Sequence, residues 1–498
     1  MLSLNRILAV GTAAVISGYL GSQVANATEP RSVGSTSGTA ETQTGTVRVI
    51  VRLKAPSGVK APSGKSDNSE VAAYSAALRK LQDAVIADHF GSSGRSKARA
   101  AKLMSISPMF AIRATAVEIA RLKADPRVES VQVDALMKPT MLDSLGIIRM
   151  TGTGGAYDKN ATGSGRAVAI FDTGVRKSHE FLKNKVIAEG CFNTTDAGFG
   201  STTRCPGGVE ETTAAGAGAD CAPSAAAGCG HGTHVAGIAA GKNTNRQSGE
   251  PKNGVAKGAK LVAVNVFSLF SPAACGTSGP CLSAYDSDLI AALDYIYTLR
   301  DGVAGTKIDS INMSLGGVIF GAYCDDSLLK PAIDLLRSVG IATVVAAGNE
   351  FYINGVSRPG CISSVITVSA STKKAKGKGE RVSSYSNIAD MTDLLAPGGD
   401  FPYPFNSNRS LIKSSYSSGN GKYRGLAGTS MAAPHVAGAI AAIRSRNACE
   451  NKTVAEIETA FQNSGKSITD HRIVMGFPQV TKRRLNVVAA MKFLGCLP

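Results

Sequence analysis

The sequence predicts an α/β fold, with a parallel sheet between two layers of helices, preceded by a small α+β module. Three observations carry this prediction. After about residue 142, short apolar runs alternate with helical patterns, which is typical of a parallel sheet covered on both faces. Before it, strand and helix patterns alternate as in a ferredoxin-like module. All 10 cysteines lie in the later region.

Length and composition indicate a folded chain with a sizeable core. The 498 residues suffice for one large domain and a smaller one, and 43% of them are hydrophobic. The net charge of +17 is scattered along the chain without a dense basic block, and no row of aromatic residues is available to stack bases. We therefore expect no nucleic-acid partner.

Residues 1–27 have the pattern of a secretory signal peptide. Arg6 precedes an apolar run from Ile7 to Leu20, and Ala25-Asn26-Ala27 fits the small-x-small rule, so cleavage is predicted after Ala27. The run is too short for a stable membrane span, and no later stretch is long and apolar enough for one. The sequence thus predicts export without a membrane anchor.

The cysteines fit an exported chain. An even number predicts disulfides, and the lack of any Cys-x-x-Cys pair argues against zinc. Cys275 and Cys281 flank a Gly/Ser/Pro turn and are expected to pair locally. Cys449 with Cys496, and Cys324 with Cys361, are further candidate pairs, and the sequence leaves the full connectivity open.

Residues 28–141 form the first region after the signal. A Ser/Thr/Gly-rich spacer up to about Thr46 predicts disorder. Thr115-Ala116-Val117-Glu118 is a capping box that starts a helix, and Pro126 ends it. The other expected elements are half-buried strands at Val47–Leu53 and Val128–Val133, an amphipathic helix at Val71–Phe90 and a strand at Met109–Ile112, with room for one more strand.

Residues 142–498 carry the parallel-sheet pattern. Apolar runs predict strands at Ala167–Phe171, Leu261–Val266, Ile308–Met313, Ile341–Ala346 and Val365–Val368. Helical patterns lie at His231–Ala240, Tyr285–Leu299 and Ser327–Ser338, and a further apolar helix follows Ser430. In such sheets the functional groups gather at the carboxyl ends of the strands. The unusual polar residues of this chain fall at those positions.

Three of these polar residues each have a structural alternative. Asp172 follows a buried strand and could simply open a turn. Asn349 follows another strand on a glycine turn, either as a turn residue or as an anion-binding donor. Ser430 lies at the start of a helix, where it could be a cap or a nucleophile beside free N–H groups and the positive end of the dipole.

Two histidines begin another small-residue helix. His231 and His234 could form a metal pair, but no third ligand is evident and the glutamate of the metalloprotease motif is missing. Gly232 and Ala236 allow close backbone packing around His231. This surrounding favours a catalytic imidazole held by its neighbours.

Together these motifs resemble those of the subtilisin-like serine proteases, the subtilases, with local likeness to the proteinase K group. The chain order Asp, His, Ser is the known subtilisin arrangement. The resemblance covers residues 142–498 and implies a subtilisin-like three-layer fold, and the module before it resembles the family's inhibitory, chaperone-like propeptide. The matching segments are Val168–Val175, Gly230–Gly237, Gly254–Lys257, Asn312–Gly317, Ala346–Glu350 and Gly428–Gly438.

The resemblance implies a role for each matching residue. Ser430 would be the nucleophile, His231 its general base, and Asp172 the group that holds the imidazole tautomer. The amide of Asn349 and the N–H of Ser430 would form the oxyanion hole. An extended substrate would pair with the strip of backbone formed by Ser314, Leu315 and Gly316, and the second substrate-binding segment would be Ala347 and Gly348.

The chain also departs from the subtilisin pattern. Phe181 stands where subtilisin has a carboxylate ligand of its tight calcium site, so we do not expect that site here. The resemblance implies no cofactor for the chemistry, and a structural calcium site elsewhere stays open. A four-cysteine insertion, Cys191 to Cys229, separates Asp172 from His231 and either shapes the cleft or decorates the surface.

The sequence therefore predicts a secreted serine endopeptidase, expected to be a monomer, that acts on proteins or peptides. It would be made as a zymogen whose own propeptide, residues 28–141, inhibits it until cut off near Lys138 to Leu142. The alternatives are a processing protease of restricted specificity, an inactive protease-fold binding protein and a metal-dependent hydrolase using His231 and His234. Glu350, beside Asn349, is a feature that could favour a basic residue before the cut.

Overall fold

Hydrophobic side chains fill both faces of a large central sheet. In the computed structural model, Val168 and Ile170 of strand β6 (Arg166–Asp172) belong to one core cluster, and Ala167 and Phe171 belong to the other. Successive side chains of a strand point to opposite faces, so a strand covered on both sides is apolar throughout. The structure describes residues 46–497 except 65, 92–100, 135, 140–144, 146, 245–246, 248–249, 373–378, 401–410 and 473–478.

The central sheet has ten strands in the order β22-β23-β19-β18-β16-β13-β6-β10-β7-β9. All neighbours from β23 to β7 pair in parallel, and β22 and β9 add antiparallel edges. The predicted parallel-sheet class is therefore confirmed. Besides β6, the strands are β7 (Val186–Phe192), β9 (Glu211–Thr212), β10 (Lys260–Asn265), β13 (Lys307–Met313), β16 (Ala342–Ala346), β18 (Ile366–Ser371), β19 (Leu394–Pro397), β22 (Lys466–Thr469) and β23 (Thr481–Arg484).

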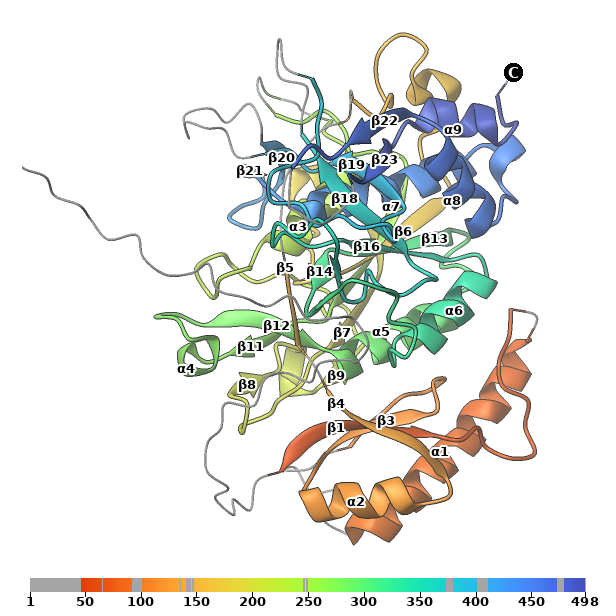
Figure 1. The fold of residues 1–498 in the computed structure, drawn as a ribbon, viewed down its shortest axis with the longest axis vertical. Coiled ribbons are helices and arrows are strands. Elements are labelled where there is room, and N and C mark those ends of the chain that lie inside the picture. Colours follow the sequence, from red (N-terminus) through yellow and green to blue (C-terminus); the bar gives the residue numbers. More distant parts are fainter. Residues whose placement is uncertain are drawn as a thin grey trace, which may run out of the picture. The chain divides into compact units, whose positions relative to one another are not determined.

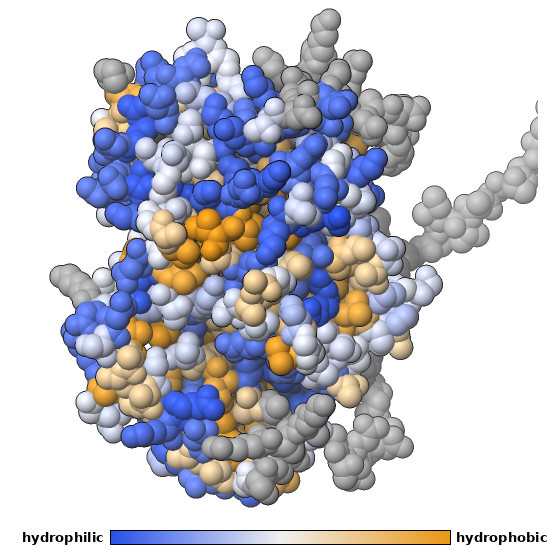
Figure 2. All heavy atoms as spheres, turned by 180° about the vertical axis from the view of Figure 1, so that it is seen from behind, coloured by the Kyte–Doolittle hydropathy of each residue, from blue (hydrophilic) through white to orange (hydrophobic). Residues whose placement is uncertain are grey.

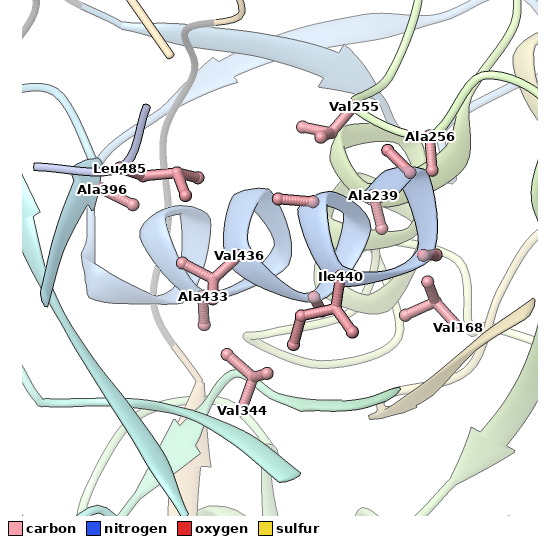
Figure 3. Packing of buried hydrophobic residues seen from close by; sticks show 14 of the residues in the cluster. Val168, Ala239, Val255, Ala256, Val344, Ala396, Ala433, Val436, Ile440 and Leu485 are labelled. Carbon is pink, nitrogen blue, oxygen red and sulfur yellow. The ribbon is translucent and has the colours of Figure 1, made fainter. Parts of the chain in front are cut away.

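Helices cover the two faces of this sheet (Figure 1). One core cluster joins the sheet to α3 (His231–Ala240), α7 (Thr429–Arg444), α8 (Val454–Asn463) and α9 (Val487–Phe493), and the other joins it to α5 (Asp286–Thr298) and α6 (Lys330–Ser338). Around α7, Val436 and Ile440 pack with Val344 and Val168 of the sheet and with Ala239 of α3 (Figure 3). A short helix, α4 (Pro272–Cys275), lies outside these layers.

A second sheet of five short strands runs β14-β5-β12-β11-β8. It contains β5 (Leu136–Pro139), β8 (Ser201–Thr202), β11 (Ser268–Phe270), β12 (Cys281–Tyr285) and β14 (Leu315–Gly316). Two small antiparallel pairs complete the strands, β15 (Ile319–Phe320) with β17 (Val356–Ser357) and β20 (Ile412–Ser415) with β21 (Tyr423–Leu426). The sequence patterns do not predict these strands, because each is only two to five residues long.

The N-terminal module is the predicted ferredoxin-like unit. Its antiparallel sheet has the order β2-β3-β1-β4, and the capping box between Thr115 and Glu118 begins α2 as expected. A second capping box, between Asp67 and Glu70, begins α1 three residues before the predicted start. The elements are β1 (Val47–Leu53), α1 (Asn68–Phe90), β2 (Lys102–Leu103), β3 (Met109–Ala114), α2 (Ala116–Ala124) and β4 (Val128–Val133).

One prediction for this module is wrong in a way that matters. The alternating pattern predicts that β1 is half-buried, yet Ile50 and Arg48, on its other face, are also buried. Ile50, Met109 and Ala111 belong to the same core cluster as helices α5 and α6. The second face of the small sheet is therefore closed by the later region of the chain, which no local pattern can reveal.

Five disulfides connect the cysteines. The structure confirms the three suggested pairs, Cys275–Cys281, Cys324–Cys361 and Cys449–Cys496. The remaining four cysteines pair within the insertion, as Cys191–Cys205 and Cys221–Cys229.

One face of the surface is largely hydrophilic, with apolar patches across its middle (Figure 2). Among the described helices, none has both the length and the apolar character that a bilayer crossing needs. The predicted signal peptide, the spacer and most of the predicted Lys138–Leu142 cut lie outside the described residues.

Candidate active site

Asp172 ends strand β6 at the centre of the large sheet and is fully buried. Its two carboxylate oxygens lie 2.7 and 2.8 Å from Nδ1 of His231, and Oδ1 also accepts the N–H of Thr173 at 2.7 Å. Because a carboxylate can only accept in this geometry, the imidazole carries its proton on Nδ1 and leaves Nε2 as the basic nitrogen.

His231 is the first residue of α3, and its neighbours are small for a steric reason. A Cβ at Gly232 would stand 2.1 Å from the carbonyl oxygen of Gly174 and 3.0 Å from the Cβ of Asp172. Gly230, the N-cap of the helix, lies in the left-handed region at φ 92°, and a Cβ there would stand 2.7 Å from the ring of Tyr416. Only glycine fits such approaches, so the close packing predicted around His231 is confirmed at Gly232.

Ser430 lies in the first turn of α7 and is buried. Gly428 is the N-cap and no side chain caps the helix, so the capping alternative for Ser430 is wrong. The Ser430 hydroxyl lies 3.1 Å from the carbonyl oxygen of Ser314, and the Ser314 hydroxyl donates to the carbonyl oxygen of Ser430 at 2.6 Å. These contacts fix the start of α7 against the end of β13. Helix α7 also packs directly on α3, which begins with His231.

Asn349 follows β16 and has an orientation set by its partners. Its Oδ1 accepts the N–H of Thr429 at 2.8 Å and the Thr429 hydroxyl at 3.1 Å. A backbone N–H must meet the oxygen of the amide, so Nδ2 is turned the other way. That nitrogen is buried and has no hydrogen-bond partner among the described residues. A buried donor without a partner lowers the free energy of unfolding by about 1–3 kcal/mol. Nδ2 is therefore a candidate donor to a bound ligand or reacting group.

The predicted substrate-binding residues lie around the same place. Gly348, at φ 106°, donates its N–H to the Thr429 hydroxyl at 3.1 Å, and the Ala347 carbonyl accepts the N–H of Ser357 at 2.8 Å. A Cβ on Gly348 would stand 2.2 Å from Oγ of Ser357. The turn from Ala347 to Asn349 is thus locked between α7 and β17.

The strip at Leu315 and Gly316 is occupied by the chain itself. In the antiparallel pairing of β14 with β5, Leu315 faces Pro139 and Gly316 faces Lys138. On its other edge β5 pairs with β12, with Ala284 opposite Met137. An extended segment therefore lies as the middle strand between β14 and β12. The motif at Ser314 identifies β14 as one edge, whereas no motif in the sequence points to β12.

The two histidines of α3 have different partners. Nε2 of His234 donates to the carbonyl oxygens of Arg424, at 2.9 Å, and Ile412, at 3.2 Å, whereas Nδ1 of His231 faces Asp172. Burial lowers the pKa of His234 to about 3, so the ring is neutral. Among the described residues, no cluster of three or more His, Cys, Asp or Glu side chains is arranged to hold a metal ion.

Phe181 has an apolar role. Its side chain is 1% exposed, lies edge-on to Tyr423 at 5.8 Å between ring centroids, and fills the space in which a Cβ of Gly241 would stand, 2.1 Å away. An aromatic ring in this packed position supplies no oxygen ligand for calcium.

Comparison with known proteins gives this arrangement its class. The model of the Subtilase family, Peptidase_S8, matches residues 163–477, which is more than half of the chain. The chain therefore belongs to the Subtilase family, and the predicted resemblance is confirmed.

Curated relatives carry related names. An "Extracellular protease" of Xanthomonas campestris pv. campestris is 35% identical over 370 residues, covering 70% of this chain and 57% of that protein. An "Extracellular serine proteinase" of a Thermus species is 31% identical over 343 residues, covering 66% of each. The chain thus spans under two thirds of the length of these relatives.

A solved structure supports the fold. Fervidolysin from Fervidobacterium pennivorans, described as a keratinolytic enzyme related to subtilisin, matches with a TM-score of 0.58 and 21% identity, over 90% of this chain and 61% of the other. At this identity the likeness concerns the fold alone.

Proposed function

We propose that this chain is a secreted serine endopeptidase that hydrolyses peptide bonds of proteins through an acyl-enzyme and is made as a self-processing zymogen. The observation that carries the proposal is the buried Nδ2 of Asn349, which has no hydrogen-bond partner among the described residues. Asn349 itself contacts Thr429, at the start of the helix that bears Ser430. A fold rarely leaves a buried donor unpaired unless a ligand or a reaction uses it. An oxyanion formed at Ser430 would be its acceptor.

The proposed reaction uses the four residues in turn. Ser430 Oγ attacks the scissile carbonyl carbon while Nε2 of His231 takes its proton. Asp172, through its two contacts with Nδ1, holds the ring in the tautomer in which Nε2 can accept a proton, and it stabilises the imidazolium. The negative charge that develops on the carbonyl oxygen is met by Nδ2 of Asn349 and the N–H of Ser430.

The second half of the reaction returns the enzyme to its starting state. The imidazolium of His231 gives its proton to the leaving amine, so the peptide bond breaks and an ester to Ser430 remains. Water then attacks the ester carbonyl, with His231 again accepting a proton. That proton returns to Ser430 Oγ as the new carboxylic acid departs.

We propose that residues 28–141 are a propeptide and residues 142–498 the protease region. The support is strand β5, which lies where an extended substrate would lie, hydrogen-bonded on both edges. Main-chain pairing of this kind recognises a peptide with little regard to its side chains. A precursor segment in this position blocks the strip and also presents a bond for self-cleavage.

Buried polar contacts hold the module on α5. Asp294 accepts the N–H groups of Ile106 and Ser107 at 2.9 and 3.0 Å, and Lys102 lies 2.5 Å from Asp288. Ionised acceptors make stronger hydrogen bonds than neutral ones. These contacts support an inhibitory complex that outlasts the first cut.

The test is the full chain with Ser430→Ala. It should abolish both hydrolysis of a peptide substrate and self-removal of the propeptide, since both use the same nucleophile. Ser445→Ala, at the other end of the same helix, is the matched control and should mature normally. An alanine variant of Ser430 that matures without another protease would refute autocatalysis.

Two further measurements separate the rival classes. A serine-directed phosphonate should label the mature wild-type protein on Ser430. Absence of labelling would favour an inactive binding protein. Loss of activity with a chelator, combined with resistance to the phosphonate, would favour a metal-dependent hydrolase instead.

A restricted, processing specificity is the second candidate. It rests on Glu350, an exposed carboxylate directly after Asn349 that also accepts the Asn349 N–H at 2.8 Å. Its neighbours Phe351 and Tyr352 are 66% and 50% exposed, and they offer apolar surface instead. Comparing substrates with a basic or an aromatic residue before the cut, in wild type and Glu350→Gln, decides between these preferences.

A further inference from the structure

The four-cysteine insertion, residues 191–229, reaches back to the turn that follows Asp172. Its two disulfides, Cys191–Cys205 and Cys221–Cys229, each stand next to a charged residue in sequence. Arg204 precedes the first bridge's second cysteine, and Asp220 precedes the second bridge's first cysteine. The contacts of these two side chains decide whether the insertion only covers the surface.

The Asp220 carboxylate accepts five hydrogen bonds. Two come from the hydroxyl and the N–H of Thr233, at 2.6 and 3.2 Å, and one from the Thr173 hydroxyl at 2.9 Å. The other two come from the N–H groups of Gly230 and Cys221, at 3.2 and 2.8 Å. All the donors except Cys221 belong to the segments that carry Asp172 or His231.

Two of these bonds involve backbone N–H groups on either side of His231 in the sequence. Gly230 directly precedes His231 and Thr233 is two residues after it, so Asp220 holds the backbone on both sides of the ring. Gly230 is the N-cap of α3 and provides no side-chain cap. The carboxylate of Asp220 takes over that function from outside the helix, where a negative charge is also favoured by the helix dipole.

The aspartate side of the pair is held in the same way. Thr173 follows Asp172, and its hydroxyl donates to Asp220 while accepting the N–H of Gly232 at 3.0 Å. Both terminal nitrogens of Arg204 donate to the Thr173 carbonyl oxygen at 3.2 Å. The insertion thus hydrogen-bonds to the turn after Asp172 through two charged side chains, Asp220 and Arg204.

We propose that Asp220 is a positioning residue for the Asp172–His231 pair, and that the insertion and its Cys221–Cys229 bridge exist to deliver it. The inference rests on the proposed function of that pair. Asp220 touches neither substrate nor reacting atoms and acts by keeping Nε2 of His231 in line with Ser430. Catalysis is sensitive to such placement, and a misplacement of about 1 Å from a distant change can cost about 100-fold in rate.

The test compares the mature enzymes of wild type, Asp220→Ala and Asp220→Asn, each cut from its full-length precursor by immobilised wild-type enzyme that is then removed. Asp309→Asn is the matched control, because Asp309 is a buried carboxylate that accepts from Arg166 and Arg444 on other elements. For each protein the thermal unfolding temperature, kcat and KM are measured on one peptide substrate.

A positioning role predicts that kcat of Asp220→Ala falls about 10- to 100-fold while KM stays within about twofold. Asp220→Asn keeps the shape and part of the accepting capacity, so its loss should be smaller. Asp309→Asn should lose stability and keep kcat. A folded Asp220→Ala with an unchanged kcat overturns the proposal. If Asp220→Ala does not fold, Asp220→Asn replaces it in the comparison, and a folded Asp220→Asn with an unchanged kcat then overturns the proposal.

A double variant separates action through the histidine from general damage. In a His231→Ala background, adding Asp220→Ala should leave the residual hydrolysis unchanged, because the ring to be positioned is absent. A further tenfold loss in that background would refute positioning through His231. Should His231→Ala itself retain full activity, the proposed function fails and not merely the role of Asp220.

Discussion

Replacing Asn349 by leucine removes both ends of its amide, and the structure gives each end a different environment. Leucine has a similar shape but removes Oδ1, which accepts the Thr429 N–H, and Nδ2, which has no partner among the described residues. Losing Oδ1 leaves the buried N–H of Thr429 without its acceptor, which costs about 1–3 kcal/mol of folding free energy, and removing the unpaired Nδ2 donor returns about 1–3 kcal/mol. The two effects offset each other, so the free energy of unfolding should change by less than about 2 kcal/mol in either direction.

The reaction should respond much more strongly than the fold. In subtilisin, a member of this family, loss of the side-chain oxyanion donor costs about 3 kcal/mol of transition-state stabilisation. That corresponds to about a 150-fold lower kcat, with KM nearly unchanged because the oxyanion exists only in the transition state. Asn349→Asp keeps the acceptor for Thr429 and places a negative charge beside the oxyanion, so its kcat should fall at least as far.

The assay is kcat and KM on a chromogenic peptide, together with urea unfolding, for wild type and both variants matured by immobilised wild-type enzyme. A leucine variant with wild-type kcat would show that Asn349 is no oxyanion donor. A leucine variant destabilised by more than about 3 kcal/mol would instead show that Nδ2 also has a hydrogen-bond partner in the folded protein, because bonds at both ends of the amide would then be lost.

Three further outcomes are expected. Asp294→Ala leaves two N–H groups of the N-terminal module without their acceptor, and such losses at an interface cost about 2–5 kcal/mol. The lag before a purified precursor becomes active should therefore shorten at least tenfold, and an unchanged lag would contradict the role of Asp294 in holding the module. Replacing Cys449 and Cys496 by serine opens a bridge that spans 47 residues and should lower the free energy of unfolding in urea by about 4 kcal/mol. Opening the shortest bridge, Cys275–Cys281, should lower it by about 2 kcal/mol, and equal losses would contradict the loop-entropy argument. Burial lowers the pKa of His234 from 6.5 to about 3, so the unfolded state binds more protons and the free energy of unfolding should fall as the pH drops from 6.5 towards 3. The slope should be shallower in His234→Gln, and identical slopes would exclude this histidine as the cause.

Much of the site can be read from local sequence because its residues stand at the ends of regular elements. An apolar run predicts a strand wherever it occurs, and parallel strands bring their carboxyl ends to one edge. Asp172 and Asn349 are therefore expected at one edge of the sheet. The helix starts at His231 and near Ser430 follow from small-residue motifs, and the structure has them as α3 and α7.

Other features depend on segments that meet only in the folded chain. Asp220 gives no signal in the sequence, since an aspartate in a Gly/Ala-rich loop is most simply a turn residue, and its five donors come from three separate stretches. The pairing of β5 with both β12 and β14 cannot be predicted because β5 and β14 are too short to show a period.

The sequence by itself determined the class of fold and the family, and it predicted the four residues of the proposed site, because periodicity, turn chemistry and motif order are local properties. The tertiary structure decided which end of the Asn349 amide lacks a partner among the described residues, which chain segment pairs with β14, why β1 is buried on both faces and what the cysteine insertion touches. Each of these depends on contacts between residues far apart in the chain, and such contacts leave no periodic trace in the order of the amino acids.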